Sequence, residues 1–226
     1  MNKIELKGKI LNFLGDSITE GYGVENIAQN RFDNILKKTC ELKGVNNYGI
    51  GGTRIAHQYQ PSETPRWDLS FCARARDMDK TADVIVIYGG VNDYFHGDAP
   101  FGKIGDSTRE TFCGSVDYLI RFLRENYPDA LLVFLTPAHA KGDEEPSKSI
   151  YKTVKGLPLQ EYVRVIEKTA GKYNLPCLSL FDDLGIDPNN TEDYEKYTTD
   201  GLHFNDAGHK VLAERIEEFL RNLKER

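Results

Sequence analysis

Residues 10–17 read Ile-Leu-Asn-Phe-Leu-Gly-Asp-Ser, a mostly apolar run that stops at a glycine, an aspartate and a serine. A short apolar run bounded by a turn signal is typical of a strand that is buried on both faces of a parallel sheet. The segment Gly15-Asp16-Ser17 is therefore predicted to follow the carboxyl end of that strand. In open parallel sheets, this edge is where ligands bind.

Four more apolar runs of this kind follow, at residues 45–48, 84–88, 131–135 and 177–180. Between them, apolar residues recur at helical spacing within residues 32–40, 112–123 and 159–170. A last helix is predicted from about Asp206 to Leu223, with Asn205 or Asp206 as its N-cap. Strands that alternate with helices predict an α/β fold, a three-layer α/β/α sandwich around a five-stranded parallel sheet.

Length and composition limit the domain number and the partners. The 226 residues, 39% of them hydrophobic, suffice for one sizeable core, and no shift in composition divides them, so a single domain over residues 1–226 is predicted. The formal net charge of −6, with scattered Lys and Arg, argues against nucleic acid and anionic membranes as partners. The oligomeric state stays open.

The sequence also bears on the cellular compartment. No signal-peptide pattern and no long apolar run are present, which predicts a cytoplasmic protein, or a secreted one if a leader has been removed. The four cysteines, which form no Cys-x-x-Cys pair, are predicted to be free thiols: Cys40, Cys72, Cys113 and Cys177.

Glycines and polar residues follow three of the predicted strands and precede the last helix. They are Gly15-Asp16-Ser17, Gly49-Ile50-Gly51-Gly52, Gly89-Gly90-Val91-Asn92-Asp93 and Asp200-Gly201-Leu202-His203. Because the carboxyl ends of parallel strands meet at one edge of the sheet, we expect these segments to converge. A hydroxyl, several amides and a histidine with a carboxylate would then share one site, as acyl transfer requires.

Ser17, His203 and Asp200 are the candidate catalytic residues. A serine hydroxyl is a weak nucleophile until a base removes its proton, and that base needs a third group to hold its tautomer. Across the glycine-containing turn, the carboxylate of Asp200 could reach Nδ1 of His203 while Nε2 faces Ser17. A histidine near a helix start is by itself more often a solvated or capping residue. Asp182 and Asp183 compete with Asp200 for its role but rank below it.

Attack by the serine would create an oxyanion that needs preorganised hydrogen-bond donors. The candidate donors are the backbone amides of Ser17 and Gly52 and the side-chain amide of Asn92. The run of glycines permits a shift of one residue, so Gly51 remains an alternative to Gly52.

Residues 13–21, Phe-Leu-Gly-Asp-Ser-Ile-Thr-Glu-Gly, resemble the first block of the SGNH (GDSL-like) hydrolase family. Residues 47–52 resemble its second block, residues 90–93 its third and residues 200–203 its last. The resemblance implies a flavodoxin-like sheet, Ser17 as nucleophile, Gly52 and Asn92 as oxyanion donors, and His203 paired with Asp200. We predict no cofactor and no metal.

The predicted function is therefore hydrolysis of carboxylic esters through an acyl-Ser17 intermediate. By analogy with family members, the expected substrate is a small ester with a short acyl group, acetyl, on a carbohydrate or a similar polyol. A lysophospholipase, a thioesterase or an acyltransferase with the same triad remains open, as does a non-catalytic carbohydrate-binding module. A metal-dependent phosphoesterase is disfavoured because the other histidines have no metal-ligand spacing; these are His57, His96, His139 and His209.

Further residues are placed by their sequence position alone. His96 and His139 are candidates for substrate contact, whereas His209 is predicted to lie on the surface of the last helix. Glu20 and Arg54 are assigned to ordinary salt bridges or to the surface. The aromatic residues expected near the pocket are Tyr22, Trp67, Tyr94, Phe95 and Phe101.

Overall fold

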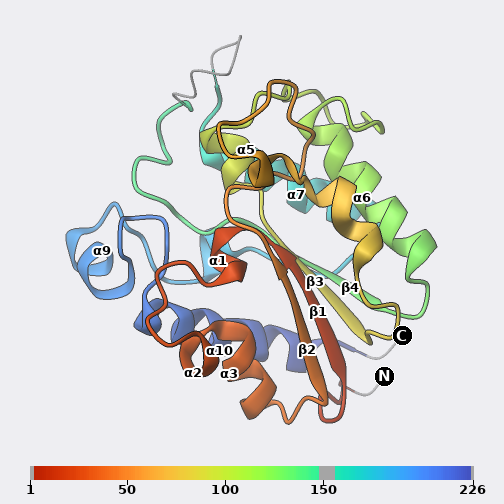
Figure 1. Ribbon diagram of the computed structural model, residues 1–226, viewed down its shortest axis with the longest axis vertical. Helices are drawn as coiled ribbons and strands as arrows, with labels where there is room; N and C mark the ends of the chain where they lie inside the picture. Colours follow the sequence, from red (N-terminus) through yellow and green to blue (C-terminus); the bar gives the residue numbers. More distant parts are fainter. Residues whose placement is uncertain (1–2, 148–155, 225–226) are drawn as a thin grey trace.

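Five parallel strands form the centre of the computed structural model, which describes residues 3–147 and 156–224. Their order across the sheet is β2-β1-β3-β4-β5, the flavodoxin-like arrangement. The strands are β1 Ile10–Gly15, β2 Gly44–Gly49, β3 Val84–Tyr88, β4 Leu131–Leu135 and β5 Cys177–Leu178. This sheet, with helices on both faces, confirms the predicted α/β fold (Figure 1).

Helices cover both faces of the sheet. In Figure 1, α2, α3 and α10 lie on one side of the strands, and α5, α6 and α7 lie on the other. The α-helices are α1 Ser17–Glu20, α2 Ile27–Asn30, α3 Phe32–Thr39, α4 Phe71–Arg74, α5 Val91–Phe95, α6 Phe112–Asn126, α7 Leu159–Lys172, α8 Leu180–Asp183, α9 Thr191–Tyr197 and α10 Asp206–Asn222. Two 3₁₀ turns, η1 Pro65–Asp68 and η2 Ala75–Asp77, complete the set.

The sheet separates two hydrophobic cores, because successive side chains of a strand point to opposite faces. Along β3, Ile85 and Ile87 belong to the core under α6 and α7, whereas Val84 and Val86 belong to the core under α3 and α10. Both faces of this strand are therefore buried, which explains its unbroken apolar sequence.

The last helix shows how a sequence pattern becomes packing. Leu212, Ile216 and Leu220 of α10 are fully buried, and each such side chain contributes roughly 1.5–3 kcal/mol on burial. The helix starts where Asn205 caps it, because the Asn205 side chain accepts a hydrogen bond from the backbone N–H of Gly208. Of the two predicted caps, Asn205 is the one observed.

Some predicted boundaries differ from the structure. The fifth strand ends at Leu178 rather than Leu180, since Leu180 already begins α8. The acidic Asp182 and Asp183 lie in the first turn of that helix, where its dipole favours negative charge. Most of the helices of four to seven residues were not predicted, because they are too short for a periodic signal. Part of the expected loop at residues 141–158 lies outside the described residues.

The two ends of the described chain meet at the amino ends of the strands. The backbone N–H of Ile4 donates to the carbonyl of Leu223 at 2.9 Å. A hollow there is lined by Ile4 and Lys224 together with Val84 and Leu131, the first residues of β3 and β4. Lys3 and Lys224 form an antiparallel bridge beside it.

Two other findings concern the whole described chain. All four cysteines are free, as predicted. Across residues 3–147 and 156–224, every helix is too short or too polar to cross a membrane.

Candidate active site

Ser17, His203 and Asp200 lie in one hydrogen-bonded row. Ser17 is the first residue of α1, directly after β1, and the carboxylate of Asp16 caps this helix by accepting from the N–H of Ile18 at 3.1 Å. Its Oγ lies 2.9 Å from Nε2 of His203, and Nδ1 of His203 lies 2.7 Å from Oδ2 of Asp200. The structure thus brings the hydroxyl of Ser17 to an imidazole and a carboxylate that lie more than 180 residues further along the sequence.

Local hydrogen bonds hold the carboxylate of Asp200 in place. Its Oδ1 accepts from the backbone N–H groups of Leu202 at 3.0 Å and His203 at 2.8 Å. Partial burial by itself would raise the pKa of Asp200, but these bonds and the imidazole of His203 outweigh it and hold the pKa below its usual value. An ionised Asp200 accepts the Nδ1 proton of His203, which leaves Nε2 to accept from the Ser17 hydroxyl.

The loop that carries His203 is tied to its surroundings. Thr198 and Phe204 form an antiparallel bridge across its base. The backbone N–H of Lys141 donates to the carbonyl of Gly201 at 2.8 Å, which links this loop to the segment after β4. The imidazole therefore comes from a braced loop rather than from the sheet itself.

The two glycines after β2 differ in their hydrogen bonding. The N–H of Gly51 donates to Oε2 of Glu20 at 2.6 Å, so it is already occupied. Among the described residues, no hydrogen bond from the N–H of Gly52 is seen. Gly52 also has a φ of +74°, which glycine adopts without strain. Of the two alternatives, Gly52 is the one whose amide is available.

Asn92 comes from α5, in the turn that follows β3. Its Nδ2 donates to the carbonyl of Thr53 at 3.0 Å, and its Oδ1 lies 3.0 Å from Nε2 of His96. The carboxylate of the next residue, Asp93, accepts from the backbone N–H groups of Ile55 and Ala56, each at 2.9 Å. These contacts connect the segment that follows β2 to the segment that follows β3.

A cleft of about 770 Å³ opens at this edge of the sheet. Ser17, Gly51, Gly52, Asn92, Asp200 and His203 all line it. The other side chains along its wall include three aromatic rings and two cations: Tyr22, Trp67, Phe95, Arg66 and Lys141. The ring centroid of Tyr22 lies 4.4 Å from that of His203, so this tyrosine covers the imidazole.

Two aromatic residues expected near the pocket belong to the core instead. Tyr94 is buried, and its hydroxyl donates to the carbonyl of Gly142 at 3.1 Å. Phe101 packs against Phe112 and Tyr162, with ring centroids 6.0 and 5.0 Å away. Neither Tyr94 nor Phe101 lines the cleft.

His209 was predicted to lie on the surface, and this prediction is wrong. The side chain is fully buried, and its Nδ1 accepts from the backbone N–H of Phe32 at 3.3 Å. It stands one helical turn before Leu212 and two before Ile216, on the inner face of α10. Burial lowers the pKa of His209 to about 4.

Glu20 and Arg54 form salt bridges, as expected; Glu20 lines the cleft, whereas Arg54 is buried behind its wall. Glu20 pairs with Arg66 at 2.7 Å and also holds Gly51. Arg54 pairs with Asp68 at 2.9 Å and is almost fully buried. In the sequence, each residue follows closely after the end of a predicted strand, and this position indicated that it would lie near the site.

The remaining candidates make other contacts. Asp182 accepts from the hydroxyl of Ser179 at 2.8 Å, and in the described chain neither Asp182 nor Asp183 bonds to His203. His139 pairs with the buried Asp143 at 2.7 Å and does not line the cleft. Among the residues that the structure describes, no three His, Cys, Asp or Glu side chains form a group that could hold a metal ion.

Residues 13–211 match the family model described as GDSL-like lipase/acylhydrolase. The chain belongs to this family. Membership implies that this GDSL-like protein is a hydrolase. The matched region contains Ser17, Gly52, Asn92, Asp200 and His203.

Solved structures resemble this GDSL-like protein over nearly its full length. A protein from Lactobacillus plantarum is 30% identical, with 95% of this chain and 97% of that chain covered and a TM-score of 0.79. A lipase/acylhydrolase from Enterococcus faecalis is 20% identical, with 96% and 98% covered and a TM-score of 0.64. A two-domain esterase active on acetylated mannans is 21% identical, with 98% and 52% covered and a TM-score of 0.62. None of the curated proteins compared with the chain matches it.

Proposed function

We propose that this GDSL-like protein is a serine esterase that cleaves carboxylic esters through an acyl-Ser17 intermediate. The observation that carries the proposal is the 2.9 Å contact between Ser17 Oγ and His203 Nε2, continued by the 2.7 Å contact between His203 Nδ1 and Asp200. A nucleophile in reach of its base, with the base held by a carboxylate, is the arrangement that activates a serine.

The proposed reaction has two steps. Oγ of Ser17 attacks the ester carbonyl carbon while His203 takes the hydroxyl proton, and His203 then gives this proton to the departing alcohol as the carbon–oxygen bond breaks. His203 next removes a proton from a water molecule, which attacks the acyl group and releases the acid. Asp200 stays ionised throughout and stabilises the imidazolium that forms in each step.

The proposed oxyanion donors are the backbone N–H groups of Ser17 and Gly52 and the side-chain amide of Asn92. They come from the ends of three adjacent strands, β1, β2 and β3. Removing one such donor typically costs about 10²- to 10³-fold in rate. The strand order would therefore matter for catalysis, because it places the three donors next to one another.

For the substrate, we propose a short acyl group, acetyl, on a carbohydrate or similar small alcohol. Trp67 packs against Gly52, so its indole would lie beside the acyl group of an ester bound at the proposed oxyanion site. Tyr22, which is 61% exposed, and Trp67 offer aromatic faces on which a sugar ring could stack. The similar two-domain esterase is active on acetylated mannans, which agrees with this choice.

The nucleophile is tested with Ser17→Ala and, as a matched control, Ser179→Ala, which removes a hydroxyl at the N-cap of α8, outside the cleft. With 4-nitrophenyl acetate, the first variant should lose at least about 10³-fold in kcat, because the base and the oxyanion donors alone cannot form the acyl-enzyme. The control should keep parental turnover. Unchanged turnover in Ser17→Ala would contradict the assignment.

A phosphonate probe separates an enzyme from a non-catalytic binding module. A fluorophosphonate should label the parent at Ser17, which peptide mass spectrometry locates, and should leave Ser17→Ala unlabelled. A protein that binds acetylated sugar but is neither labelled nor active would favour the binding module.

The acyl preference is tested by the chain length of the ester. Acetyl and propionyl esters should have the highest kcat/KM, and acetylated manno-oligosaccharides should release acetate. A profile that rises beyond about six carbons would contradict the acetyl proposal and favour the lysophospholipase or thioesterase alternative, because each additional buried CH₂ contributes roughly 0.8 kcal/mol.

A further inference from the structure

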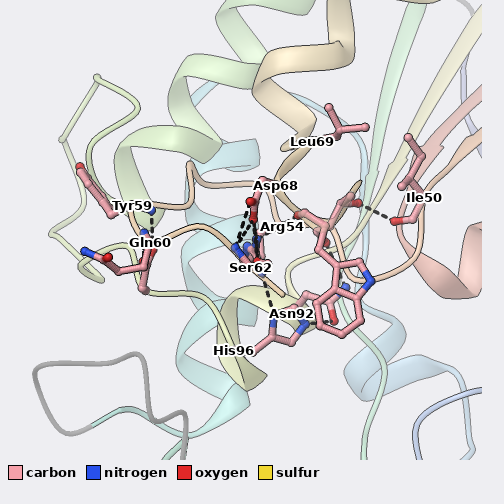
Figure 2. Close-up of polar contacts among 12 residues, drawn as sticks. Ile50, Arg54, Tyr59, Gln60, Ser62, Asp68, Leu69, Asn92 and His96 are labelled. Atoms are coloured by element: carbon pink, nitrogen blue, oxygen red, sulfur yellow. Dashed lines mark hydrogen bonds and ion pairs between the residues drawn. The ribbon is translucent and has the colours of Figure 1, made fainter. Parts of the chain in front are cut away.

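Arg54 is a buried cation directly behind the cleft wall. Its side chain is 1% exposed, and its Nη2 contacts Oδ1 of Asp68 at 2.9 Å, the carbonyl of Trp67 at 2.9 Å and the hydroxyl of Ser62 at 3.2 Å. Its Nη1 lies 2.7 Å from Nδ1 of His96. In Figure 2, Arg54 lies between Asp68 and the His96–Asn92 pair.

The chemistry of these groups fixes which atom donates in the hydrogen bonds that run from Arg54 through His96 to Asn92. A guanidinium only donates, so Nδ1 of His96 accepts and carries no proton. The proton of the neutral imidazole is then on Nε2, which donates to Oδ1 of Asn92 at 3.0 Å. The arginine thereby selects one of the two histidine tautomers.

The hydrogen bond from His96 decides which side of the Asn92 amide carries the oxygen. Because Oδ1 accepts from His96, Nδ2 lies on the other side, where one of its two hydrogens is donated to the carbonyl of Thr53 at 3.0 Å. A flipped amide would put its oxygen on the side of Thr53, against another oxygen. Asn92 lines the cleft, so the same flip would replace a donor with an acceptor in the proposed oxyanion site.

The burial of Arg54 also fits a role in positioning rather than in net stability. Burial lowers the pKa of Arg54, while Asp93, Asp68 and Asp98 oppose this effect. A buried ion pair adds little net stability compared with apolar side chains, since desolvation of both charges offsets their attraction. What Arg54 provides in addition is a fixed set of donors, which reach the carbonyl of Trp67 and the ring of His96 at once.

From these contacts we infer that Arg54 and His96 are positioning residues, which hold the Asn92 amide so that its second N–H, the one not donated to Thr53, faces the oxyanion. The inference rests on the proposed function, in which Asn92 is an oxyanion donor. Neither Arg54 nor His96 needs to touch the reacting atoms, because they act through Asn92.

A pair of histidine variants tests the role of Nε2. The amide nitrogen of a glutamine can reach the position of Nε2, so His96→Gln should keep the donor to Asn92, whereas the shorter side chain of His96→Asn cannot reach it. We expect kcat to fall about 10-fold in His96→Asn, less than the loss of a whole donor, and less than about 3-fold in His96→Gln. KM should change little, because the oxyanion exists only in the transition state. Equal losses in both variants would overturn the inference.

A double variant shows whether His96 acts through Asn92. If it does, adding His96→Asn to Asn92→Ala should cause no further loss of kcat, because the positioned group is already gone. A further 10-fold loss would overturn the positioning role and indicate a general structural effect. Parental kcat in Asn92→Ala would instead contradict the proposed oxyanion role of Asn92, and full activity in Ser17→Ala would contradict the proposed function itself.

The tautomer can be measured in the parent protein, without any risk of misfolding. In ¹⁵N-histidine-labelled protein, the His96 resonances are identified by their loss in His96→Gln. The inference requires the proton on Nε2 and an unprotonated Nδ1 at the pH of the assay. A proton on Nδ1, or on both nitrogens, would overturn it.

Discussion

Trp67 packs directly on the backbone of Gly52: a methyl group at Gly52 would lie 2.4 Å from the indole Cδ1. Gly52 also has a φ of +74°, a conformation that side chains other than glycine rarely adopt. Position 52 therefore excludes a side chain for two independent reasons. The indole and the Gly52 amide together form one wall of the cleft.

We predict that Gly52→Ala lowers kcat at least about 10-fold, because it must displace Trp67 and adopt a backbone strained by roughly 1–2 kcal/mol. Gly51→Ala is the matched control, since a methyl group there would meet the flexible end of Glu20 at 2.9 Å rather than a packed ring. Steady-state kinetics and the melting temperature should show the larger change for Gly52→Ala. A larger kcat loss in Gly51→Ala would assign the amide to residue 51.

Asp200→Asn should reduce kcat by about 10²- to 10⁴-fold with little unfolding, because the amide oxygen can still accept from the turn while the amide nitrogen opposes Nδ1 of His203. The pKa of Asp200 lies below its usual value of 3.8. This carboxylate therefore stays ionised as the pH falls from 8 to 5, and its protonation does not set the acid limb of the rate profile in that range. Kinetics of the parent and the variant from pH 5 to 9 test both statements; a variant with parental kcat would rule out the proposed role.

His209 should make stability fall as the pH decreases from about 6.5 to about 4. Its pKa is about 4 in the folded protein and near the ordinary 6.5 when unfolded, so in this range the unfolded state binds the extra proton. The contribution is fully present above pH 6.5 and amounts to about 3 kcal/mol. Urea unfolding of the parent and of His209→Gln at several pH values should show a smaller pH dependence in the variant. Equal slopes would contradict this prediction.

Arg74 joins the carboxyl ends of β1 and β2. Its guanidinium donates to the carbonyls of Gly15, at 2.6 Å, and Tyr48, and to the hydroxyl of Thr53 at 2.9 Å. Arg74→Met removes a donor from three acceptors, of which the carbonyl of Gly15 keeps the backbone N–H of Ile50 at 3.1 Å. The variant should lower the free energy of unfolding by about 3 kcal/mol, since a buried acceptor left without a donor costs about 1–3 kcal/mol. Arg76→Met, at an exposed position in η2, is the control and should stay within about 0.5 kcal/mol of the parent. A similar loss in both variants would count against this account.

The sequence predicted the sheet well because strands such as β3 are buried on both faces and so read as continuous apolar runs. It also predicted which distant residues would meet, since parallel strands place Ser17, Gly52 and Asn92 at one edge. The catalytic roles of these residues remain predictions that the variants above can test.

Other features had no local signal in the sequence. The contact between Arg54 and His96 joins the segment after β2 to the end of α5, and no pattern within either segment reveals it. His209 was misplaced because one polar residue on a helix reads as exposed, whereas here the N–H of Phe32 satisfies its Nδ1 and permits burial. Such pairings depend on tertiary packing and not on periodicity.

The meeting of the chain ends at the amino side of the sheet has a practical consequence. The cleft opens at the opposite edge, so a fusion partner, an affinity handle or a solid support attached at either end would leave the entrance unobstructed. The short distance between the ends also makes a circularly permuted chain feasible, with new ends placed in an exposed loop away from the cleft.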